Sequence, residues 1–340
     1  MAKKTQQHRS PNITMKDVAK LANLSEMTVS RVLTGKGYSS KAAEAKVLAA
    51  AKQLGYFPNK LAGALASDRS NIVGVVLPNL SNSVFTEVMS GIYNGLANKG
   101  LQPVFGISEY SKTKEEQLIK DMVEWRPLGL IVTGLEHSSE TKDILKSLDS
   151  KVVELIDTDG RPISKCVGLS HKKAGATMAE HLLEKGYKRF AYIGSNLQLD
   201  TRAKKRKQGF ESAINDSGAT IINELTPKDA SSMMLGRQLT AELLSQNHQI
   251  DAIYYSNDDM AAGGLMHCLA TGLKPPRDIA LASFNGLEFI DALPLKITTI
   301  KSPRFEIGRL AADYIANEAS ESLPKATNEL IFTLEEGDTT

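Results

Sequence analysis

Residues 14–69 read TMKDVAKLANLSEMTVSRVLTGKGYSSKAAEAKVLAAAKQLGYFPNKLAGALASDR. The pattern predicts two short helices separated by a tight turn at residues 23–25, followed by a third helix that is rich in alanine. Pro58 and Asn59 end that third segment, and one more small helical segment follows them. A basic module of this size is suited to placing a helix in a DNA groove rather than to catalysis. The rest of the chain must then explain what controls the module.

Local signals place the helices of this module. Thr14 and Asp17 have capping-box spacing, so a helix is expected to begin directly after Thr14. Ser25 is positioned to cap the second helix, and Gly55 to end the third. The side chains expected to form the buried faces of the three helices are, in order, Val18, Leu21 and Ala22, then Val29, Val32 and Leu33, then Val47, Ala51 and Leu54.

Two stretches carry a specific resemblance: DVAKLANLSEMTVSRVL at residues 17–33 and LGYFPNKLAGALA at residues 54–66. Together they resemble the DNA-binding head and hinge of the lactose-repressor family of bacterial transcriptional regulators. The resemblance implies a flexible arm over residues 1–13, a helix-turn-helix domain over 14–58, a hinge helix and linker over 59–69, and an effector-binding and dimerisation body over 70–340.

The resemblance also assigns roles within the head. Glu26, Met27 and Arg31 match base-reading positions of the recognition helix, and an arginine that binds guanine contributes about 1–3 kcal/mol of discrimination. Glu26 and Met27 depart from the aromatic-plus-amide pair of the lactose repressor itself, so the bases they read stay open. Leu65 matches a leucine wedge that enters the minor groove, from a hinge helix too short to be stable alone. The side chains expected to touch mostly phosphates are Ser25, Thr28, Ser30, Asn59 and Lys60.

The charge of the chain is unevenly distributed. Residues 1–70 hold 12 Lys and Arg against 4 Asp and Glu, whereas the remainder holds 29 against 35. A basic head on an acidic body indicates a polyanionic partner for the head only. Cys166 and Cys268 have no metal or redox spacing and are expected to be small buried side chains. No secretion signal or long apolar run is recognisable, so a cytoplasmic, nucleoid-associated location and no membrane contact are expected.

From residue 72 onward, apolar strand-like runs alternate with amphipathic helical runs. This alternation predicts an α/β body with parallel sheets covered by helices on both faces. The body is large for one doubly wound sheet, so we expect two lobes of similar topology, as in periplasmic sugar-binding proteins, with crossovers near residues 160–170 and 294–299. Strands are expected at 72–77, 102–107, 129–132, 152–156, 190–193, 252–255 and 279–284, and helices at 84–98, 114–125, 172–185, 204–217, 233–246 and 258–271.

Ligands of such sheets bind beyond the carboxyl ends of the strands, here between the lobes. By the family resemblance, Arg206 matches an arginine that holds a sugar, and Asn257 and Asn285 match a polar pair at two strand ends. The second of that pair is an acid in the lactose repressor. The loops expected to line the site are 78–85, 134–137, 157–159, 194–206, 256–258 and 284–288.

A neutral Asn285 beside Arg206 favours an anionic ligand, and further cations lie nearby at Arg202, Lys204, Lys205 and Lys207. The stretches LPNLSNSVFTEVMSGI, VVELID and YIG…TR…KQGF resemble the gluconate-repressor subgroup. The expected effector is therefore a sugar acid such as gluconate or a ketogluconate, with or without a phosphate.

Simpler roles compete with these assignments. Arg31 and the cations around Arg206 can be solvated helix charges, Asn257 can merely cap a helix, and Phe85 is as well suited to a core as to stacking on a ligand. We interpret His137 and His171 as incidental to the site.

The sequence thus predicts a transcriptional regulator, a repressor that pairs as a homodimer and presents two heads to a near-palindromic operator. The effector is expected to rearrange the lobes and change operator affinity, either releasing DNA or, as a corepressor, tightening the complex. A carbohydrate-binding transport protein is the alternative that the body alone would permit. Catalysis, a metal and a cofactor are not expected, because no nucleophile elbow, phosphate-binding loop or metal-ligand cluster is recognisable.

Overall fold

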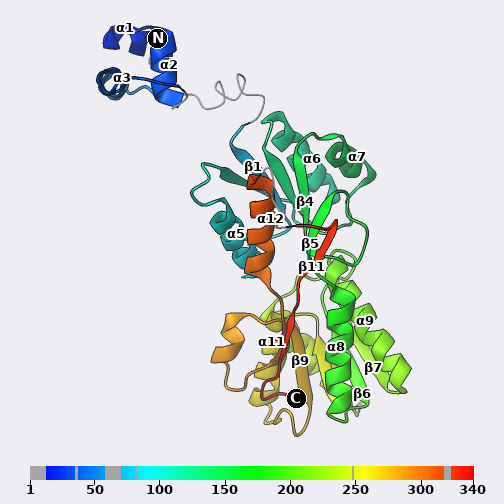
Figure 1. Cartoon of the computed structure of the whole chain (residues 1–340). Helices are drawn as coiled ribbons and strands as arrows, with labels where there is room; N and C mark the ends of the chain where they lie inside the picture. The colour runs from blue at the N-terminus through cyan, green and yellow to red at the C-terminus, as the bar shows by residue number, and fades with distance from the viewer. Residues whose placement is uncertain (1–12, 35–36, 58–69, 81–82, 247–248, 318–322) are drawn as a thin grey trace, which may run out of the picture. The chain divides into compact units, whose positions relative to one another are not determined.

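The computed structural model of the 340-residue chain (Figure 1) describes residues 13–34, 37–57, 70–80, 83–246, 249–317 and 323–340. Contacts divide the chain into two compact units, residues 1–70 and 71–340. The expected hinge lies outside the described residues, as do Asn59, Lys60 and Leu65.

The first unit is a three-helix module with a small apolar core. Thr14 and Asp17 form the expected capping box, and Gly55 ends the third helix in a left-handed conformation. One expected core position is wrong: Leu21 is 44% exposed, and Ala19 is buried instead. Residues 18, 19 and 22 share one face at helical spacing, whereas position 21 lies off that face. The three helices are α1 (Met15–Ala22), α2 (Glu26–Thr34) and α3 (Lys41–Leu54).

The second unit contains two lobes, each built on a six-stranded sheet. The expected doubly wound topology is confirmed, because every strand pair is parallel except β10 with β12. In lobe 1 the strand order is β11-β5-β4-β3-β1-β2. Its elements are β1 (Ile72–Leu77), α5 (Ser83–Leu96), β2 (Gln102–Ile107), α6 (Lys112–Glu124), β3 (Gly129–Thr133), α7 (Ser139–Ser147), β4 (Lys151–Asp157), β5 (Lys165–Leu169), α12 (Arg304–Ala316) and β11 (Thr327–Glu329).

Lobe 2 repeats this arrangement with the order β12-β10-β9-β8-β6-β7. Its short 3-10 helix, η1, follows β9. The elements are α8 (His171–Glu184), β6 (Arg189–Ile193), α9 (Thr201–Ser217), β7 (Thr220–Leu225), α10 (Met233–Ser245), β8 (Ala252–Tyr255), α11 (Asp258–Ala270), β9 (Ala280–Asn285), η1 (Glu288–Ala292), β10 (Thr298–Lys301) and β12 (Thr333–Glu335).

The chain crosses between the lobes three times. The first crossing, expected near residues 160–170, lies at Ser170 between β5 and α8. The second was expected near 294–299 but lies at residues 302–303, because β10 still pairs with β9 in lobe 2. A third crossing, at residues 330–332 between β11 and β12, was not expected. All three crossings meet where the lobes face each other.

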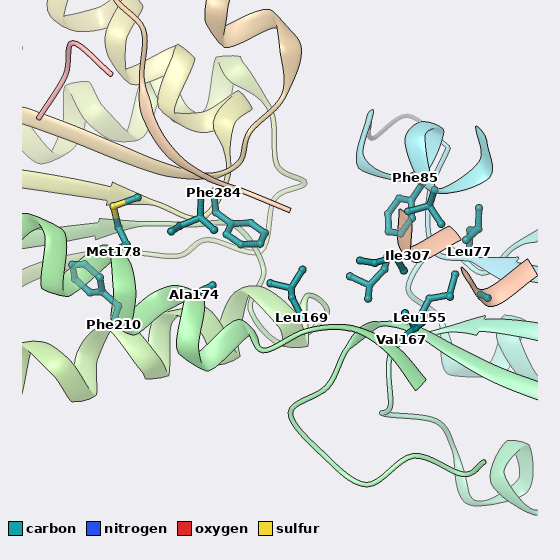
Figure 2. Packing of buried hydrophobic residues seen from close by; sticks show 14 of the residues in the cluster. Leu77, Phe85, Leu155, Val167, Leu169, Ala174, Met178, Phe210, Phe284 and Ile307 are labelled. Atoms are coloured by element: carbon teal, nitrogen blue, oxygen red, sulfur yellow. The ribbon is translucent and has the colours of Figure 1, made fainter. Parts of the chain in front are cut away.

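Buried apolar side chains continue from one lobe to the other. Figure 2 shows Phe85 and Ile307 of lobe 1 on one side and Phe284 of lobe 2 on the other, with Leu169 between them. Cys166 and Cys268 are both free and fully buried, as expected. The lobes therefore share a hydrophobic contact close to the crossings.

Helices α5 and α12 of lobe 1 lie side by side (Figure 1) and approach each other through glycines. A Cβ atom added to Gly91 would lie 2.0 Å from the Phe305 carbonyl oxygen, and one added to Gly308 would lie 2.2 Å from that of Val88. Reciprocal glycines of the same kind occur between α8 and α9 and between α10 and α11. These helix pairs pack backbone against backbone, so their positions tolerate no larger side chain.

We expect Gly91→Ala to lower the free energy of unfolding by about 1–3 kcal/mol, because the added methyl group meets a carbonyl oxygen that cannot rotate away. The intrinsic helix preference of alanine acts in the opposite direction and is smaller. Urea unfolding followed by circular dichroism measures the change. Lys146→Ala on α7, an exposed position in the same lobe, is the control and should stay within about 0.5 kcal/mol of the parent protein. If Gly91→Ala left the free energy of unfolding unchanged, the close packing of α5 against α12 at this position would be contradicted.

Candidate functional site

The second helix of the head, α2, presents a polar surface. Ser25 caps it by accepting a hydrogen bond from the Thr28 backbone N–H at 3.2 Å. Glu26, Met27 and Arg31 are exposed, Met27 by 65%, and the Arg31 guanidinium lies 3.3 Å from the Met27 sulfur. Ser25 is also exposed, and Thr28 and Ser30 are half-buried. The three side chains predicted to read DNA bases, those of Glu26, Met27 and Arg31, are therefore exposed and take no part in the apolar core of the module.

A cavity lies between the two lobes at the carboxyl ends of their strands. The unfilled space there amounts to about 510 Å³ when open solvent is included, and about 40 Å³ of it can hold the centre of a water molecule; we call it the inner compartment. All five predicted effector residues line it. The residues that line the inner compartment are Val84, Phe85, Tyr110, Ile156, Leu169, His171, Asp200, Arg202, Arg206, Asn257, Phe284, Asn285, Ser302 and Ile307.

Arg206 is the buried cation of this compartment. It is only 5% exposed, projects from α9 and lies over the Phe284 ring, with 4.0 Å between the guanidinium carbon and the ring centroid. One terminal nitrogen donates to the Ser256 carbonyl at 3.0 Å and the other lies 3.0 Å from Nδ1 of His171. The Nε atom makes no hydrogen bond among the described residues. Arg206 is thus held rigidly and keeps capacity for a ligand.

His171, which we interpreted as incidental, belongs to the site. Arginine can only donate hydrogen bonds, so Nδ1 of His171 accepts from Arg206 and the neutral ring carries its proton on Nε2. Burial, reinforced by Arg206 and Arg202, holds the pKa of His171 well below its ordinary value. Nε2 makes no hydrogen bond among the described residues. His171 therefore adds a neutral donor to the compartment rather than a charge.

Both predicted amides lie at strand ends. Asn257 caps α11 by accepting from the Met260 N–H at 3.0 Å and donates to the Ser231 hydroxyl at 2.7 Å, so it combines the capping role with a position on the cavity wall. Asn285 ends β9 with φ of +133°, a strained conformation for a residue other than glycine. Its carbonyl accepts a hydrogen bond from Arg304, which fixes the strand end.

Arg202 and Phe85 contact each other from different lobes. The Arg202 guanidinium lies 5.8 Å from the Phe85 ring centroid and 5.9 Å from that of Tyr110. Phe85 is 2% exposed and belongs to the shared core, and it also lines the inner compartment. Burial opposes ionisation of Asp200, but Arg202 and Arg206 outweigh it and hold the pKa of this carboxyl below its usual range. The charges of Arg202, Arg206 and Asp200 together leave the compartment with a single net positive charge.

The expected contribution of the neighbouring lysines is wrong. Lys204 is exposed, whereas Lys207 is half-buried and pairs with Glu211 and with Glu224, the latter at 2.9 Å. Lys205 reaches from lobe 2 into lobe 1, where its Nζ lies 2.5 Å from Glu136 and also contacts Asp157. Sequence proximity to Arg206 suggested a positive field, but Lys205 and Lys207 are paired with carboxylates and Lys204 is exposed to solvent.

Lys205, Glu136 and Asp157 together form what we call the interlobe bridge. Thr201 strengthens it by donating to Glu136 at 3.1 Å. Asp157 ends β4 directly after Ile156, whose φ of +77° is unusual for a β-branched residue. The bridge holds the lobes in the arrangement seen here and lies next to the inner compartment.

His137, also interpreted as incidental, is buried between two carboxylates of lobe 1. Its Nδ1 lies 2.7 Å from Glu115 and its Nε2 lies 3.4 Å from Glu154. Burial alone would lower the pKa of His137, but the two carboxylates outweigh burial and raise it to about 9. His137 is therefore an imidazolium at neutral pH.

We expect this imidazolium to make stability depend on pH. Its pKa is raised on folding, so the stabilisation is fully present below about pH 6.5 and is lost as pH rises through about 9. The loss amounts to roughly 3 kcal/mol. The free energy of unfolding of the parent protein and of His137→Gln, measured by urea unfolding at intervals from pH 6.5 to pH 10, should converge as pH rises. A constant difference between them would show that His137 is not charged.

Several lining residues were missed by sequence reasoning. Tyr110 follows β2 in a loop that we did not select, and Leu169, His171, Ser302 and Ile307 come from the crossings. The signal that could have found the last four is position, because a segment that crosses between lobes must pass the cleft.

Within the described part of the chain, no three or more His, Cys, Asp or Glu side chains are arranged to hold a metal ion. The described helices include none with both the length and the apolar character that spanning a bilayer requires.

Comparison with known proteins gives two family matches. Residues 14–59 match the bacterial regulatory proteins of the lacI family, and residues 70–330 match the periplasmic binding proteins and sugar-binding domain of that family. The chain is 37% identical over 304 residues to the HTH-type transcriptional regulator GntR of Pseudomonas aeruginosa, covering 89% of this chain and 88% of the relative. It is 31% identical to GntR of Escherichia coli K12 over 324 residues, covering 95% and 97%. A crystal structure of a LacI family transcriptional regulator from Silicibacter pomeroyi superposes with a TM-score of 0.91 at 43% identity, covering 96% of this chain and 99% of that one.

Proposed function

The chain belongs to the LacI (lactose-repressor) family of DNA-binding transcriptional regulators, and from this premise we propose that a sugar acid bound between its lobes controls its affinity for operator DNA. Gluconate and ketogluconates are the proposed effectors, because the charge of the inner compartment favours an acid. The proposed regulator is a repressor that acts as a homodimer.

The observation that carries this proposal is the environment of Arg206. A guanidinium that is 5% exposed and stacked on Phe284 keeps an N–H that has no partner among the described residues, at the wall of the cavity between the lobes. A carboxylate is the natural partner of such a group. The net single positive charge of the compartment matches a monoanion, so an unphosphorylated sugar acid is favoured over a phosphorylated one.

The remaining walls suit the hydroxylated chain of a sugar acid. The amides of Asn257 and Asn285 and the neutral N–H of His171 supply polar contacts, while Phe284 and Ile307 supply apolar surface. Sugars combine hydroxyl groups with apolar C–H faces, and they need both kinds of contact. Arg202 is proposed to contact the effector from the side of Phe85.

For the head we propose the roles that the family resemblance assigned. Arg31, Glu26 and Met27 read base edges in the major groove, and Leu65 wedges into the minor groove. The proposed division is an arm over residues 1–13, a head over 14–58, a hinge over 59–69 and a body over 70–340. The proposed phosphate contacts are Ser25, Thr28, Ser30, Asn59 and Lys60.

The proposed coupling acts through the position of the lobes. The inner compartment and the interlobe bridge both join lobe 1 to lobe 2, so a bound effector stabilises one lobe arrangement. Two heads of a symmetric dimer then engage two half-sites, and a change in head spacing changes operator affinity.

We propose further that the protein catalyses no reaction and acts where the genome lies, in the cytoplasm. Its relatives are named transcriptional regulators, which supports the absence of catalysis. Binding of operator DNA requires that the protein be in the cytoplasm. Turnover of gluconate by the purified protein would contradict the absence of catalysis.

Two titrations test the proposal. Isothermal titration calorimetry of the full-length protein with gluconate, 5-ketogluconate and glucose should give binding of the acids and none of glucose. Fluorescence anisotropy with a near-palindromic operator should then show weaker DNA binding once the acid is added. Tighter DNA binding would make the acid a corepressor, and binding of glucose alone would refute the anionic effector.

A further inference from the structure

The cleft between the lobes has a second, larger compartment. This outer compartment encloses about 1130 Å³ of space, part of it open to solvent. Its walls come from both lobes, with residues 108–112 and 133–136 on one side and residues 198–202 on the other. It is therefore part of the same interlobe cleft, and it has more than twice the enclosed space of the inner compartment.

Tyr110 and Arg202 line both compartments, so the two compartments adjoin at these side chains. Tyr110 is held in place by an unusual backbone, because Glu109 and Tyr110 are consecutive residues other than glycine with φ of +52° and +59°. Backbone strain of this kind concentrates at ligand-binding sites. The guanidinium of Arg202 lies 5.9 Å from the Tyr110 ring centroid, so the two side chains lie next to each other where the compartments adjoin.

The outer compartment is polar but offers little unpaired charge. Glu136 is held by Lys205 of the interlobe bridge, and Glu115 is held by His137. Thr133 donates its hydroxyl hydrogen to the Val76 carbonyl, which leaves the oxygen available as an acceptor. The wall carries three carboxylates and two cations, and the excess of carboxylates disfavours a phosphate; the lining residues concerned are Glu109, Glu115, Glu136, Lys112 and Arg202. Hydroxyl and carboxylate oxygens accept hydrogen bonds from a neutral, hydroxylated ligand.

We propose that the outer compartment binds a second sugar unit, so that the full effector is an aldonic acid carrying a glycosyl group. The inner compartment holds the acid at Arg206, and the glycosyl group lies beyond Tyr110 and Arg202 against Thr133, Gln198 and Leu199. The inference rests on the proposed function, because it needs an acid in the inner compartment. A ligand of this length contacts both lobes in both compartments.

Calorimetry of the full-length protein with gluconate, maltobionate (4-O-glucosyl-gluconate), 6-phosphogluconate and maltose tests the inference. Maltobionate is expected to bind at least five times more tightly than gluconate, and maltose is expected to show no binding. If gluconate binds and maltobionate binds tenfold more weakly or not at all, the second sugar site is refuted while the proposed function stands. Tightest binding of 6-phosphogluconate would likewise refute a neutral second unit. Failure of all the acids to bind would refute the proposed function itself.

Leu199→Trp places added bulk in the outer compartment only. Leu199 is 53% exposed, so the larger side chain is tolerated by the fold. Maltobionate affinity should fall about tenfold, and gluconate affinity should stay within twofold. Ile222→Trp, on an exposed apolar position of the same lobe outside both compartments, is the matched control and should change neither affinity. Equal weakening of both acids by Leu199→Trp would overturn the assignment.

Discussion

Replacing Arg206 with methionine is expected to weaken gluconate binding by at least about 100-fold and to abolish the response of operator binding to the effector. Removing one partner of a buried, hydrogen-bonded charge pair costs roughly 2–5 kcal/mol of binding free energy. Methionine keeps apolar contact with the Phe284 ring but supplies neither the charge nor the donors. Calorimetry measures the affinity, and anisotropy with operator DNA measures the response.

The same substitution acts on the walls of the compartment. Without Arg206, the Ser256 carbonyl and Nδ1 of His171 lose their donors. Arg206 contributes to the lowered pKa of His171, but burial is the larger cause and persists in the variant, so the imidazole stays neutral and does not replace the lost charge.

Lys204→Met is the matched control, because it removes an equal charge from the same helix at an exposed position. It should bind gluconate within about twofold of the parent protein, since long-range attraction by exposed charges is screened by salt. Urea unfolding of both variants identifies any general loss of fold. Gluconate binding by Arg206→Met within threefold of the parent protein would show that the acid does not bind where we place it.

The sequence was informative where local pattern determines structure. Strands β1, β2 and β8 begin and end at the expected residues. Strands β1 and β8 are short, buried apolar runs bounded by turn residues, whereas β2 lies at a sheet edge and is only partly buried. β7 was missed because it lies at a sheet edge and its burial alternates, so it lacks the apolar run of a central strand. Strand β10 was missed for a different reason: its residues were assigned to a crossing that lies further on.

In the candidate site, too, some features could be predicted from the sequence and others could not. Arg206, Asn257 and Asn285 could be named in advance because the family resemblance aligns single positions. The charge of the cleft could not be predicted from the sequence, because Lys205 pairs with Glu136 and Asp157, which lie 69 and 48 residues away along the chain. His171 was missed because its role depends on a contact with Arg206 that only the folded lobe creates. Position-specific resemblance thus predicted residues that line the cavity between the lobes, but not the electrostatic potential they produce together.

The difference between the charges counted along the sequence and those left in the folded cleft bears on the choice of effector. Counting cations along residues 202–207 favoured an anionic ligand and left a phosphorylated acid open. Pairing in the fold reduces the inner compartment to two cations and one ionised carboxylate. A monoanion neutralises that excess, whereas a phosphate would bring further negative charge toward Asp200 into a low-dielectric site. The folded charge distribution, not the sequence count, therefore favours gluconate over its phosphate ester.

Replacing Arg31 with alanine is expected to weaken binding to the cognate operator by roughly 5- to 150-fold, the equivalent of about 1–3 kcal/mol for a bidentate contact with guanine. Arg31 is exposed, so the free energy of unfolding should change little. Binding to random duplex should fall far less, because it depends on phosphate contacts. Anisotropy titrations with cognate and random duplexes at 150 mM salt measure both affinities.

Arg31→Lys separates charge from geometry at this position. Lysine keeps the positive charge but has no planar pair of donors, so it should lose specificity while the dependence of affinity on salt stays near that of the parent protein. Lys52→Ala, which removes an exposed charge from α3, should preserve the ratio of cognate to random affinity. The ratio distinguishes a base-reading arginine from a solvated helix charge, because loss of a solvated charge lowers both affinities by the same factor. An Arg31→Ala protein with an unchanged ratio would mean that Glu26, Met27 or another side chain of α2 reads the operator instead.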